Sequence, residues 1–257
     1  MIKALKELAA GAADLICPPD LYCICCGKII DGSRTYRLCN ECMDSVKWAG
    51  ERVCSKCGKR LSDIDPGTVC FSCREHPHIF DRGYTCAEYG THERAIVFSL
   101  KYGGRSDIAS VIGGIMADRM LALYSADELV CMYDIVLPVP LHHRRKLARG
   151  YNQAALIAES FSRIAGIECD DGILRRVKET HMMRSLTPDQ RRDNIRGAFE
   201  VRKHRAGELR GKSILIIDDI YTTGATIDEI ASVLRTAGAD RVEFISFASG
   251  ADVVKSA

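Results

Sequence analysis

Apolar positions along the second half of the chain fall into two spacings. Short segments rich in aliphatic and aromatic residues predict strands at residues 83–89, 133–140, 214–217 and 241–248. Apolar residues three and four positions apart predict amphipathic helices at residues 92–103, 106–125, 152–166 and 227–238. Strands that alternate with helices in this way predict an α/β fold with a doubly wound parallel sheet.

One segment follows neither spacing. Residues 175–196 are polar and rich in arginine, with little apolar periodicity. A connection of this length without secondary structure of its own is uncommon inside a compact domain. We therefore expect this segment to be either a functional flap or disordered.

The strand predicted at 214–217 runs directly into two carboxylates, Asp218 and Asp219. The loop that follows lies between the carboxyl end of a strand and the amino end of a helix, where open α/β sheets bind their ligands. Its residues 222–226, Thr-Thr-Gly-Ala-Thr, offer backbone N–H groups, a helix dipole and hydroxyls, which suit a phosphate monoester. Carboxylates repel a phosphate but accept hydrogen bonds from a diol, so the whole string suits a ribose 5-phosphate. The alternative, an acidic strand end with a threonine helix cap, explains a single threonine only.

A nucleotide triphosphatase does not fit the spacing. Residues 207–213, GELRGKS, resemble a phosphate loop, but three residues instead of four separate the first glycine from the Gly-Lys pair. The segment also precedes a strand, whereas a phosphate loop follows a strand and opens a helix. This class of enzyme is therefore set aside.

The composition is that of an ordinary soluble globular protein, with 47% hydrophobic and 27% charged residues among 257. This length accommodates one full domain and a small second one. A net charge of +2 gives no overall indication of nucleic-acid or membrane binding. The apolar runs are too short for a membrane span, and Glu7 and Asp14 interrupt the N-terminal one, so we expect a cytoplasmic protein without membrane attachment.

Cysteines add a second feature, because eleven of the thirteen precede residue 90. Eight of them form Cys-x2-Cys pairs, and the pairs that begin at residues 23 and 39 recur 31 residues later, at 54 and 70. Each half of this repeat supplies four thiolates, the closed ligand set of a structural zinc site. We predict two sequential zinc sites in preference to an interleaved arrangement: Cys23, Cys26, Cys39 and Cys42 in the first, and Cys54, Cys57, Cys70 and Cys73 in the second.

The cysteine-rich region leaves two questions open. Cys25 lies inside the first pair and could compete as a ligand. Zinc ribbons often bind nucleic acid, and the aromatic rings of Tyr22, Tyr36, Trp48 and Phe71 could stack on bases. The same rings could instead cover the metal sites, and several acidic residues offset the basic ones here.

The string IIDDIYTTGAT is similar to the motif with which type I phosphoribosyltransferases bind phosphoribosyl pyrophosphate. It follows, in order, the CxxCG pairs, LKYGG (100–104), LPVPLH (137–142), RGYNQA (149–154) and RRDNIRGAF (191–199). This order resembles the ComF family, the amidophosphoribosyltransferase-like competence proteins, over nearly the whole chain from Cys23 to Ala248.

The resemblance implies a type I phosphoribosyltransferase-like domain at 80–250, a double zinc-binding module at 21–76 and an N-terminal helical segment at 1–20. It implies that Asp218 and Asp219 hold the ribose hydroxyls and that Mg²⁺ accompanies the ligand. Arg149 and Lys101 would act on the leaving pyrophosphate, and the segment 175–199 would close over the site. The remaining ligand contacts implied are Tyr221, Thr222, Thr223, Gly224, Ala225 and Thr226 at the 5-phosphate, and Pro140, Leu141 and His142 at the pyrophosphate.

Two functions from different classes stay open. The first is transfer of a phosphoribosyl group to an acceptor that no residue pattern identifies. The second is a non-catalytic protein of DNA uptake, which binds single-stranded DNA or a partner of the competence machinery. Met183 stands where related sequences usually carry glutamine, which puts one contact of the flap in doubt. The oligomeric state is open.

Overall fold

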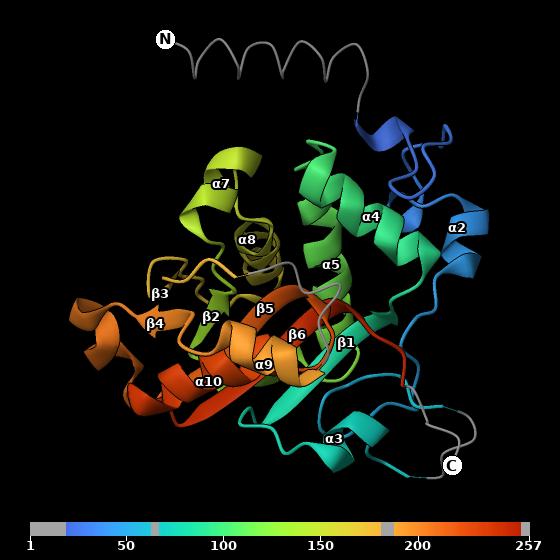
Figure 1. Ribbon diagram of the computed structural model, residues 1–257. Coiled ribbons are helices and arrows are strands. Elements are labelled where there is room, and N and C mark those ends of the chain that lie inside the picture. The colour runs from blue at the N-terminus through green and yellow to red at the C-terminus, as the bar shows by residue number, and fades with distance from the viewer. Residues whose placement is uncertain (1–18, 63–66, 181–187, 253–257) are drawn as a thin grey trace, which may run out of the picture.

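A four-stranded parallel sheet forms the centre of the computed structural model, which describes residues 19–62, 67–180 and 188–252 (Figure 1). Every pair of neighbouring strands in this sheet is parallel. The strands lie in the order β1 (Arg82–Glu88), β6 (Arg241–Ser249), β5 (Ser213–Tyr221) and β2 (Ile135–Pro138). All four predicted strands are confirmed, but β5 is longer than predicted and carries Asp218 and Asp219 within it.

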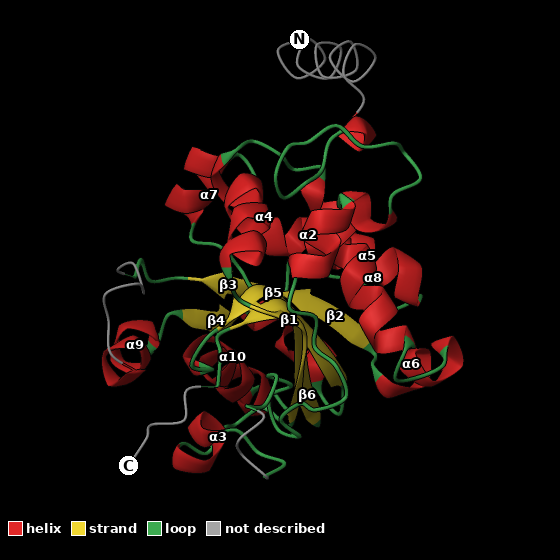
Figure 2. Cartoon of the chain, turned by 90° about the vertical axis from the view of Figure 1, so that its right-hand side faces the viewer, coloured by secondary structure: helices red, strands yellow, loops and turns green. Residues whose placement is uncertain are grey.

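Helices cover both faces of the sheet, as Figure 2 shows. One face carries α4 (Thr91–Tyr102), α5 (Ile108–Leu121) and α8 (Gln153–Ala165), and the other carries α10 (Ala225–Thr236). These are the four helices predicted from apolar spacing, with the one expected at 106–125 ending at Leu121. The doubly wound arrangement is confirmed.

The alternation of side chains along β5 explains why both faces are apolar. Leu215 and Ile217 belong to a buried cluster with residues of α4, α5 and α8, whereas Ile214 and Ile216 belong to a second cluster with residues of α10. A parallel sheet covered on both faces needs such continuous apolar strands. The run of aliphatic residues in β5 therefore places the following carboxylates at the end of a strand buried on both faces.

The arginine-rich segment has secondary structure of its own in the part that the structure describes. β3 (Leu174–Arg176) and β4 (Phe199–Val201) form an antiparallel pair, and α9 (Pro188–Ile195) lies between them in sequence and beside α10 in space. Residues 181–187, which include Met183, lie outside the described residues. The predicted role of the segment as a flap stays a prediction.

The remaining elements are short. They are α2 (Asn40–Ser45), α3 (Phe71–Glu75), α6 (Ala126–Met132), α7 (His143–Arg149) and the 3-10 turns Pro19–Leu21, Thr35–Arg37 and Lys203–Leu209. Of the predicted N-terminal segment 1–20, all but the last two residues lie outside the described ones. Among the described helices none is by itself long and apolar enough to span a membrane; α5 and α6 reach that composition only together, across a bend of 97°.

The two halves of the cysteine repeat pack against opposite faces of the sheet. Cys23 and Cys42 of the first half lie in the apolar cluster on the α5 face, and Cys54 and Cys57 of the second half lie in the cluster on the α10 face. Residues 47–56, which connect the halves and begin the second one, run along the edge of β1. There Ala49 N–H donates to the Cys86 carbonyl at 2.7 Å, Glu88 N–H to Lys47 at 2.8 Å and Gly83 N–H to Lys56 at 2.8 Å. These bonds cover a sheet edge that would otherwise be open to pairing with other chains.

Candidate active site and metal centres

A cavity of about 340 Å³ opens at the carboxyl end of the sheet, beside the last residues of β2 and β5. Helices α4, α7, α8 and α10 and the residues Arg176, Thr180 and Arg191 supply its other walls. Its polar lining is formed by Tyr89, Arg94, Lys101, Tyr102, Arg145, Arg149, Gln153, Arg176, Thr180, Arg191, Asp218, Asp219, Thr222, Thr223 and Thr226. This is the edge at which open α/β sheets bind ligands, as predicted.

The two carboxylates at the end of β5 have different surroundings. Asp219 is buried, and its Oδ2 lies 2.5 Å from Nζ of Lys101, which comes from the last turn of α4. Burial works to lower the pKa of Lys101, but the ion pair with Asp219 outweighs it and raises that pKa. Burial and the neighbouring Asp219 carboxylate raise the pKa of Asp218 well above its ordinary value. The site therefore holds one carboxylate in an ion pair next to a second one, Asp218, for which no ion pair is found among the described residues.

The loop after β5 has the shape expected of an anion cradle. Thr222, Thr223, Ala225 and Thr226 line the cavity at the amino end of the twelve-residue helix α10. Gly224 has a φ of +83°, a conformation that other residues adopt only with strain. Backbone N–H groups at a helix start have no partner within the helix, so this loop can donate to a phosphate.

Four contacts show what the residues of the motif RGYNQ do in the structure. Tyr151 Oη donates to the Leu100 carbonyl beside Lys101, and Asn152 Nδ2 donates to the Val139 carbonyl at 3.1 Å. The guanidinium of Arg149 lies 5.3 Å from the ring centre of Tyr102 and donates to Gln153 Oε1. The motif thus joins the end of α4 to the turn after β2 while it turns Arg149 toward the cavity.

Positive charge dominates the cavity. Within the described residues its walls carry six basic side chains and two carboxylates, the latter being Asp218 and Asp219. Burial lowers the pKa of Arg176 to about 10, with Arg145 as a further cationic neighbour. Both arginines hold the same segment: Arg145 donates to the Thr180 carbonyl at 2.8 Å and Arg176 to the Thr180 hydroxyl. Two cations held this closely favour an anion between or beside them.

The structure brings together most of the residues expected at a ligand. Lys101, Pro140, Leu141, Arg149 and the carboxylates line the cavity with Thr222, Thr223, Ala225 and Thr226. Three predicted positions do not line it: the Tyr221 and His142 side chains are buried, and Gly224 lies against the rings of His78 and Tyr221. Tyr221 instead stacks on Phe244 at 4.7 Å, since it is the last residue of β5 and faces the α10 cluster. Tyr221 and His142 can reach a ligand only through their backbones.

Two groups of cavity residues escaped the sequence patterns. Arg145 and Arg176 belong to basic segments in which no single arginine stands out, and Arg94 with Tyr89 lies near the start of α4 outside any motif. The spacing of Arg94 and Lys101, seven residues or two helical turns apart, was a signal that both face one side of α4.

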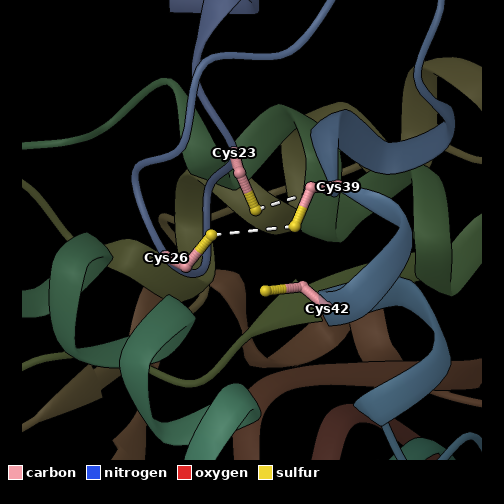
Figure 3. A group of neighbouring side chains, drawn as sticks. All are labelled: Cys23, Cys26, Cys39 and Cys42. Carbon is pink, nitrogen blue, oxygen red and sulfur yellow. Dashed lines mark hydrogen bonds between the residues drawn. The ribbon is translucent and has the colours of Figure 1, made fainter.

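The eight predicted cysteines form two separate clusters. In each cluster the four sulfur atoms lie within 4.8 Å of one another, and Figure 3 shows those of Cys23, Cys26, Cys39 and Cys42 pointing toward a common centre. The Sγ atoms of Cys26 and Cys39 are 3.7 Å apart, and those of Cys57 and Cys70 are 3.6 Å apart. A tetrahedral zinc ion with Zn–S bonds of about 2.3 Å places its sulfurs roughly 3.8 Å apart. The donor sets therefore fit two zinc ions, one in each half of the repeat, as predicted.

Cys25 stands beside the first cluster. Its sulfur, that of Cys42 and the ring of His92 form a further group of possible ligands, so Cys42 is shared between two sets. Cys25 Sγ also lies 3.7 Å from the His92 carbonyl oxygen. The complete four-sulfur set is the better match to a closed zinc site.

The aromatic rings of the cysteine-rich region pack against the protein. Tyr36 donates to Asp118 of α5 at 2.8 Å, Trp48 donates to the Met43 carbonyl at 3.3 Å, and the two ring centres lie 5.8 Å apart. Tyr22 and Phe71 are half-buried. The contacts of Tyr36 and Trp48 favour a structural use of these two rings.

Comparisons with known proteins agree with this arrangement. Residues 149–254 match the phosphoribosyl transferase domain, and residues 12–74 match the double zinc ribbon domain. The chain is 29% identical to the DNA utilization protein YhgH of Escherichia coli O157:H7 over 206 residues, 80% of this chain and 87% of that one. It is 27% identical to competence protein F of Haemophilus influenzae over 208 residues, again 80% and 87%.

Two further likenesses extend over different lengths. Competence protein ComFC of Streptococcus pneumoniae is 27% identical over 242 residues, 88% of this chain and 99% of its own. Among solved structures, the allosteric regulatory enzyme of purine biosynthesis aligns with 58% of this chain at 18% identity and a TM-score of 0.38. This chain covers only 29% of that protein.

The chain therefore joins a phosphoribosyltransferase domain to an N-terminal double zinc ribbon. It belongs to the family of competence proteins that contains competence protein F and YhgH.

Proposed function

We propose that this protein binds phosphoribosyl pyrophosphate together with Mg²⁺ and transfers the phosphoribosyl group to an acceptor. The observation that carries the proposal is the pairing of Asp218 and Asp219 with a phosphate cradle and a set of cations in one cavity. A phosphoribosyl pyrophosphate molecule needs all three: acceptors for a diol, donors for a monophosphate and positive charge for a pyrophosphate.

Each part of the cavity suits one part of this ligand. The loop 222–226 would bind the 5-phosphate, and Asp218 and Asp219 would accept hydrogen bonds from the ribose hydroxyls. The turn at Pro140 and Leu141 and the side chains of α7 would face the pyrophosphate. Lys101, held against Asp219, would place one positive charge between the ribose and the pyrophosphate.

The chemistry is substitution at C1 of the ribose. The lone pair of the acceptor forms the new bond to C1, the bond from C1 to the pyrophosphate oxygen breaks, and its electron pair leaves with the pyrophosphate. The acceptor releases a proton to solvent if it carried one. Mg²⁺ bound to the pyrophosphate would neutralise part of its charge. Arg149 and Arg145 would stabilise the charge that develops on the leaving group, because both come from α7 at the rim of the cavity.

Pyrophosphate release tests the transferase proposal. The native protein would be incubated with phosphoribosyl pyrophosphate, Mg²⁺ and, separately, ammonia, purine bases and pyrimidine bases. Release above that of Asp218→Asn/Asp219→Asn with one acceptor supports transfer and identifies the acceptor class. Binding without release for any acceptor would leave a ligand-binding protein.

A second candidate is binding of single-stranded DNA at the mouth of the same cavity. Phe98 and Tyr102 of α4 are 51% and 60% exposed, their ring centres lie 4.9 Å apart, and Arg94 and Arg149 flank them. Exposed aromatic rings among arginines suit stacked bases and a phosphate backbone, and two relatives are named for DNA utilization or competence.

Salt dependence and two variants would test the second candidate. A strand affinity that falls steeply with salt, and that is lost in Phe98→Ala/Tyr102→Ala but kept in Tyr22→Ala, would place the strand at the cavity mouth. Loss of affinity in Tyr22→Ala together with native affinity in Phe98→Ala/Tyr102→Ala would instead implicate the zinc ribbons. A cytoplasmic location, where thiols stay reduced, would suit both functions and both zinc clusters.

A further inference from the structure

The segment that leaves the second cysteine cluster runs directly beneath the ligand loop. The His78 side chain, five residues after Cys73, is fully buried, and its Nδ1 lies 2.7 Å from Oδ2 of Asp228 in the first turn of α10. The other oxygen of Asp228 accepts the Ile79 N–H at 2.8 Å. The segment 78–79 therefore holds α10 just after the loop.

The same imidazole also touches the loop and the residue before it. A Cβ atom at Gly224 would lie 2.6 Å from Cε1 of His78 and 2.9 Å from Oη of Tyr221, so the loop backbone rests directly on both rings. His78 Nε2 lies 3.5 Å from Oη of Tyr221. One side chain thus contacts the start, the middle and the end of the string from Tyr221 to Asp228.

Aromatic packing joins His78 to the body of the second ribbon. His78 stacks on Phe80 at 4.6 Å, and Phe80 meets the rings of Tyr221 and Phe244 edge to face at 6.2 Å and 4.9 Å. Lys59 is 5% exposed, and its Nζ lies 5.4 Å from the centre of the Tyr221 ring. Cys54, Cys57 and Cys70 belong to the same apolar cluster as these rings.

The turn of the second ribbon at Gly58 is also fixed to the sheet. A Cβ atom at Gly58 would lie 2.6 Å from the Gly83 carbonyl oxygen, so only glycine permits this approach of the ribbon to β1. Thr85 of β1 donates its hydroxyl to the Gly58 carbonyl.

The first ribbon has no such attachment at the matching positions of the repeat. Gly27 corresponds to Gly58, and nothing in the described part of the chain lies within 4 Å of a Cβ atom placed there. Lys28 corresponds to Lys59, yet it is exposed and pairs with Glu41 at 2.6 Å. Two halves with the same metal-binding pattern therefore differ in their connection to the ligand loop.

We propose that the second zinc cluster holds the ligand loop, residues 222–226, in its binding conformation. His78 is the positioning residue that connects the cluster to the loop. This inference rests on the proposed binding of the 5-phosphate by residues 222–226. A loop held in its binding conformation before the ligand arrives loses less conformational freedom on binding. Loss of zinc from the second cluster therefore weakens ligand binding, whereas loss from the first does not.

Replacement of His78 tests the link without touching a cysteine. His78→Ala is compared with His76→Ala, the same change two residues earlier, where no side-chain hydrogen bond or ion pair is found within the described residues. Both variants should keep two zinc ions per chain. His78→Ala should speed amide hydrogen exchange in residues 219–228 and weaken the binding of phosphoribosyl pyrophosphate with Mg²⁺ about tenfold. His78→Asn, whose amide can donate where Nδ1 does, should recover part of both losses.

Amide hydrogen exchange and ligand affinity, measured together, separate the role of His78 from the proposed function. If the native protein does not bind phosphoribosyl pyrophosphate, the proposed function fails, while the exchange comparison still decides whether His78 holds the loop. Native-like exchange at 219–228 in His78→Ala, or an equal change in His76→Ala, overturns the inference. Native-like affinity in a His78→Ala protein with faster exchange overturns it as well.

Matched cysteine changes test the zinc cluster itself. Cys54→Ser/Cys57→Ser should lose one zinc ion and loosen residues 219–228, whereas Cys23→Ser/Cys26→Ser should lose one zinc ion and leave the exchange of these residues unchanged. Because the second pair is buried, its variant can fail to fold. In that case the His78 variants, which keep every thiolate, decide the question. Equal loosening of the loop by both cysteine variants would contradict the special role of the second ribbon.

Discussion

The Nζ atom of Lys101 lies 2.5 Å from Oδ2 of Asp219. This ion pair connects the LKYGG string at the end of α4 with the Asp-Asp pair at the end of β5, two motifs that are far apart in the sequence. Asp219 is buried, so a negative charge there needs a nearby cation to compensate it. Lys101 supplies that cation beside one of two adjacent carboxylates, in a cavity that raises the pKa of the other one, Asp218.

Replacement of Lys101 should cost stability. In Lys101→Met, the buried Asp219 carboxylate loses its cation, which should lower the free energy of unfolding by about 3 kcal/mol. Urea denaturation at neutral pH measures this loss. The double variant Lys101→Met/Asp219→Asn should recover much of it because the carboxylate left without its cation is also removed. A single variant as stable as the native protein would show that Asp219 does not depend on Lys101.

Replacement of Asp218, unlike that of Lys101, should raise the stability of the protein in the absence of ligand. Because its folded-state pKa is raised, this group favours folding at low pH, and that contribution is lost as the pH rises through the folded pKa. Asp218→Asn should therefore raise the melting temperature at about pH 8 by roughly 2–4 °C, and the gain should shrink toward about pH 4. Thermal unfolding of both proteins across this range measures it. A gain that grows toward low pH would contradict the sign of the shift.

Binding of two ligands, phosphoribosyl pyrophosphate and ribose 5-phosphate, should distinguish the pyrophosphate site from the 5-phosphate site. Arg145→Ala and Arg149→Ala should each weaken the binding of phosphoribosyl pyrophosphate about tenfold or more, because a charged hydrogen bond to the pyrophosphate is lost. Neither change should affect ribose 5-phosphate, which has no pyrophosphate. Thr223→Val should weaken both ligands, since residues 222–226 would bind the shared 5-phosphate. Calorimetric titration distinguishes the cases, and an equal loss of affinity for both ligands in Arg149→Ala would contradict the placement of the pyrophosphate.

Zinc stoichiometry tests the sequential assignment of the cysteines. The native chain should hold two zinc ions, and Cys23→Ser/Cys26→Ser should hold one, because the two clusters share no sulfur. Cys25→Ser should retain both ions. Metal analysis of the purified proteins measures this. Loss of both ions from the Cys23→Ser/Cys26→Ser protein, or of one ion from Cys25→Ser, would contradict the assignment.

Local patterns predicted the elements and the ligand loop because both depend on neighbours in sequence. The aliphatic run of β5, the helix start at Gly224 and the spacing of the Cys-x2-Cys pairs each act within a few residues. The end of β5 was missed, since Asp218 and Asp219 interrupt the apolar run although β6 continues to pair alongside them. Hydrogen bonds to a neighbouring strand override the local pattern here.

Long-range packing could not be predicted from these patterns. Nothing in the 31-residue repeat indicates that its halves lie on opposite faces of the sheet, because that depends on how Gly58 and Lys59 meet β1 and Tyr221. The inward position of Arg94 and the burial of His142 likewise follow from tertiary contacts. Motif matches identified which residues matter, whereas the fold decides which side chains face the cavity.

The most direct test is calorimetric titration of phosphoribosyl pyrophosphate with Mg²⁺ into the zinc-loaded native protein and into Asp218→Asn/Asp219→Asn. Because the carboxylates would bind the ribose hydroxyls, we expect micromolar affinity for the native protein and no measurable binding by the folded double variant. Absence of binding by the native protein, or equal binding by both proteins, would contradict the assignment of this ligand to the cavity.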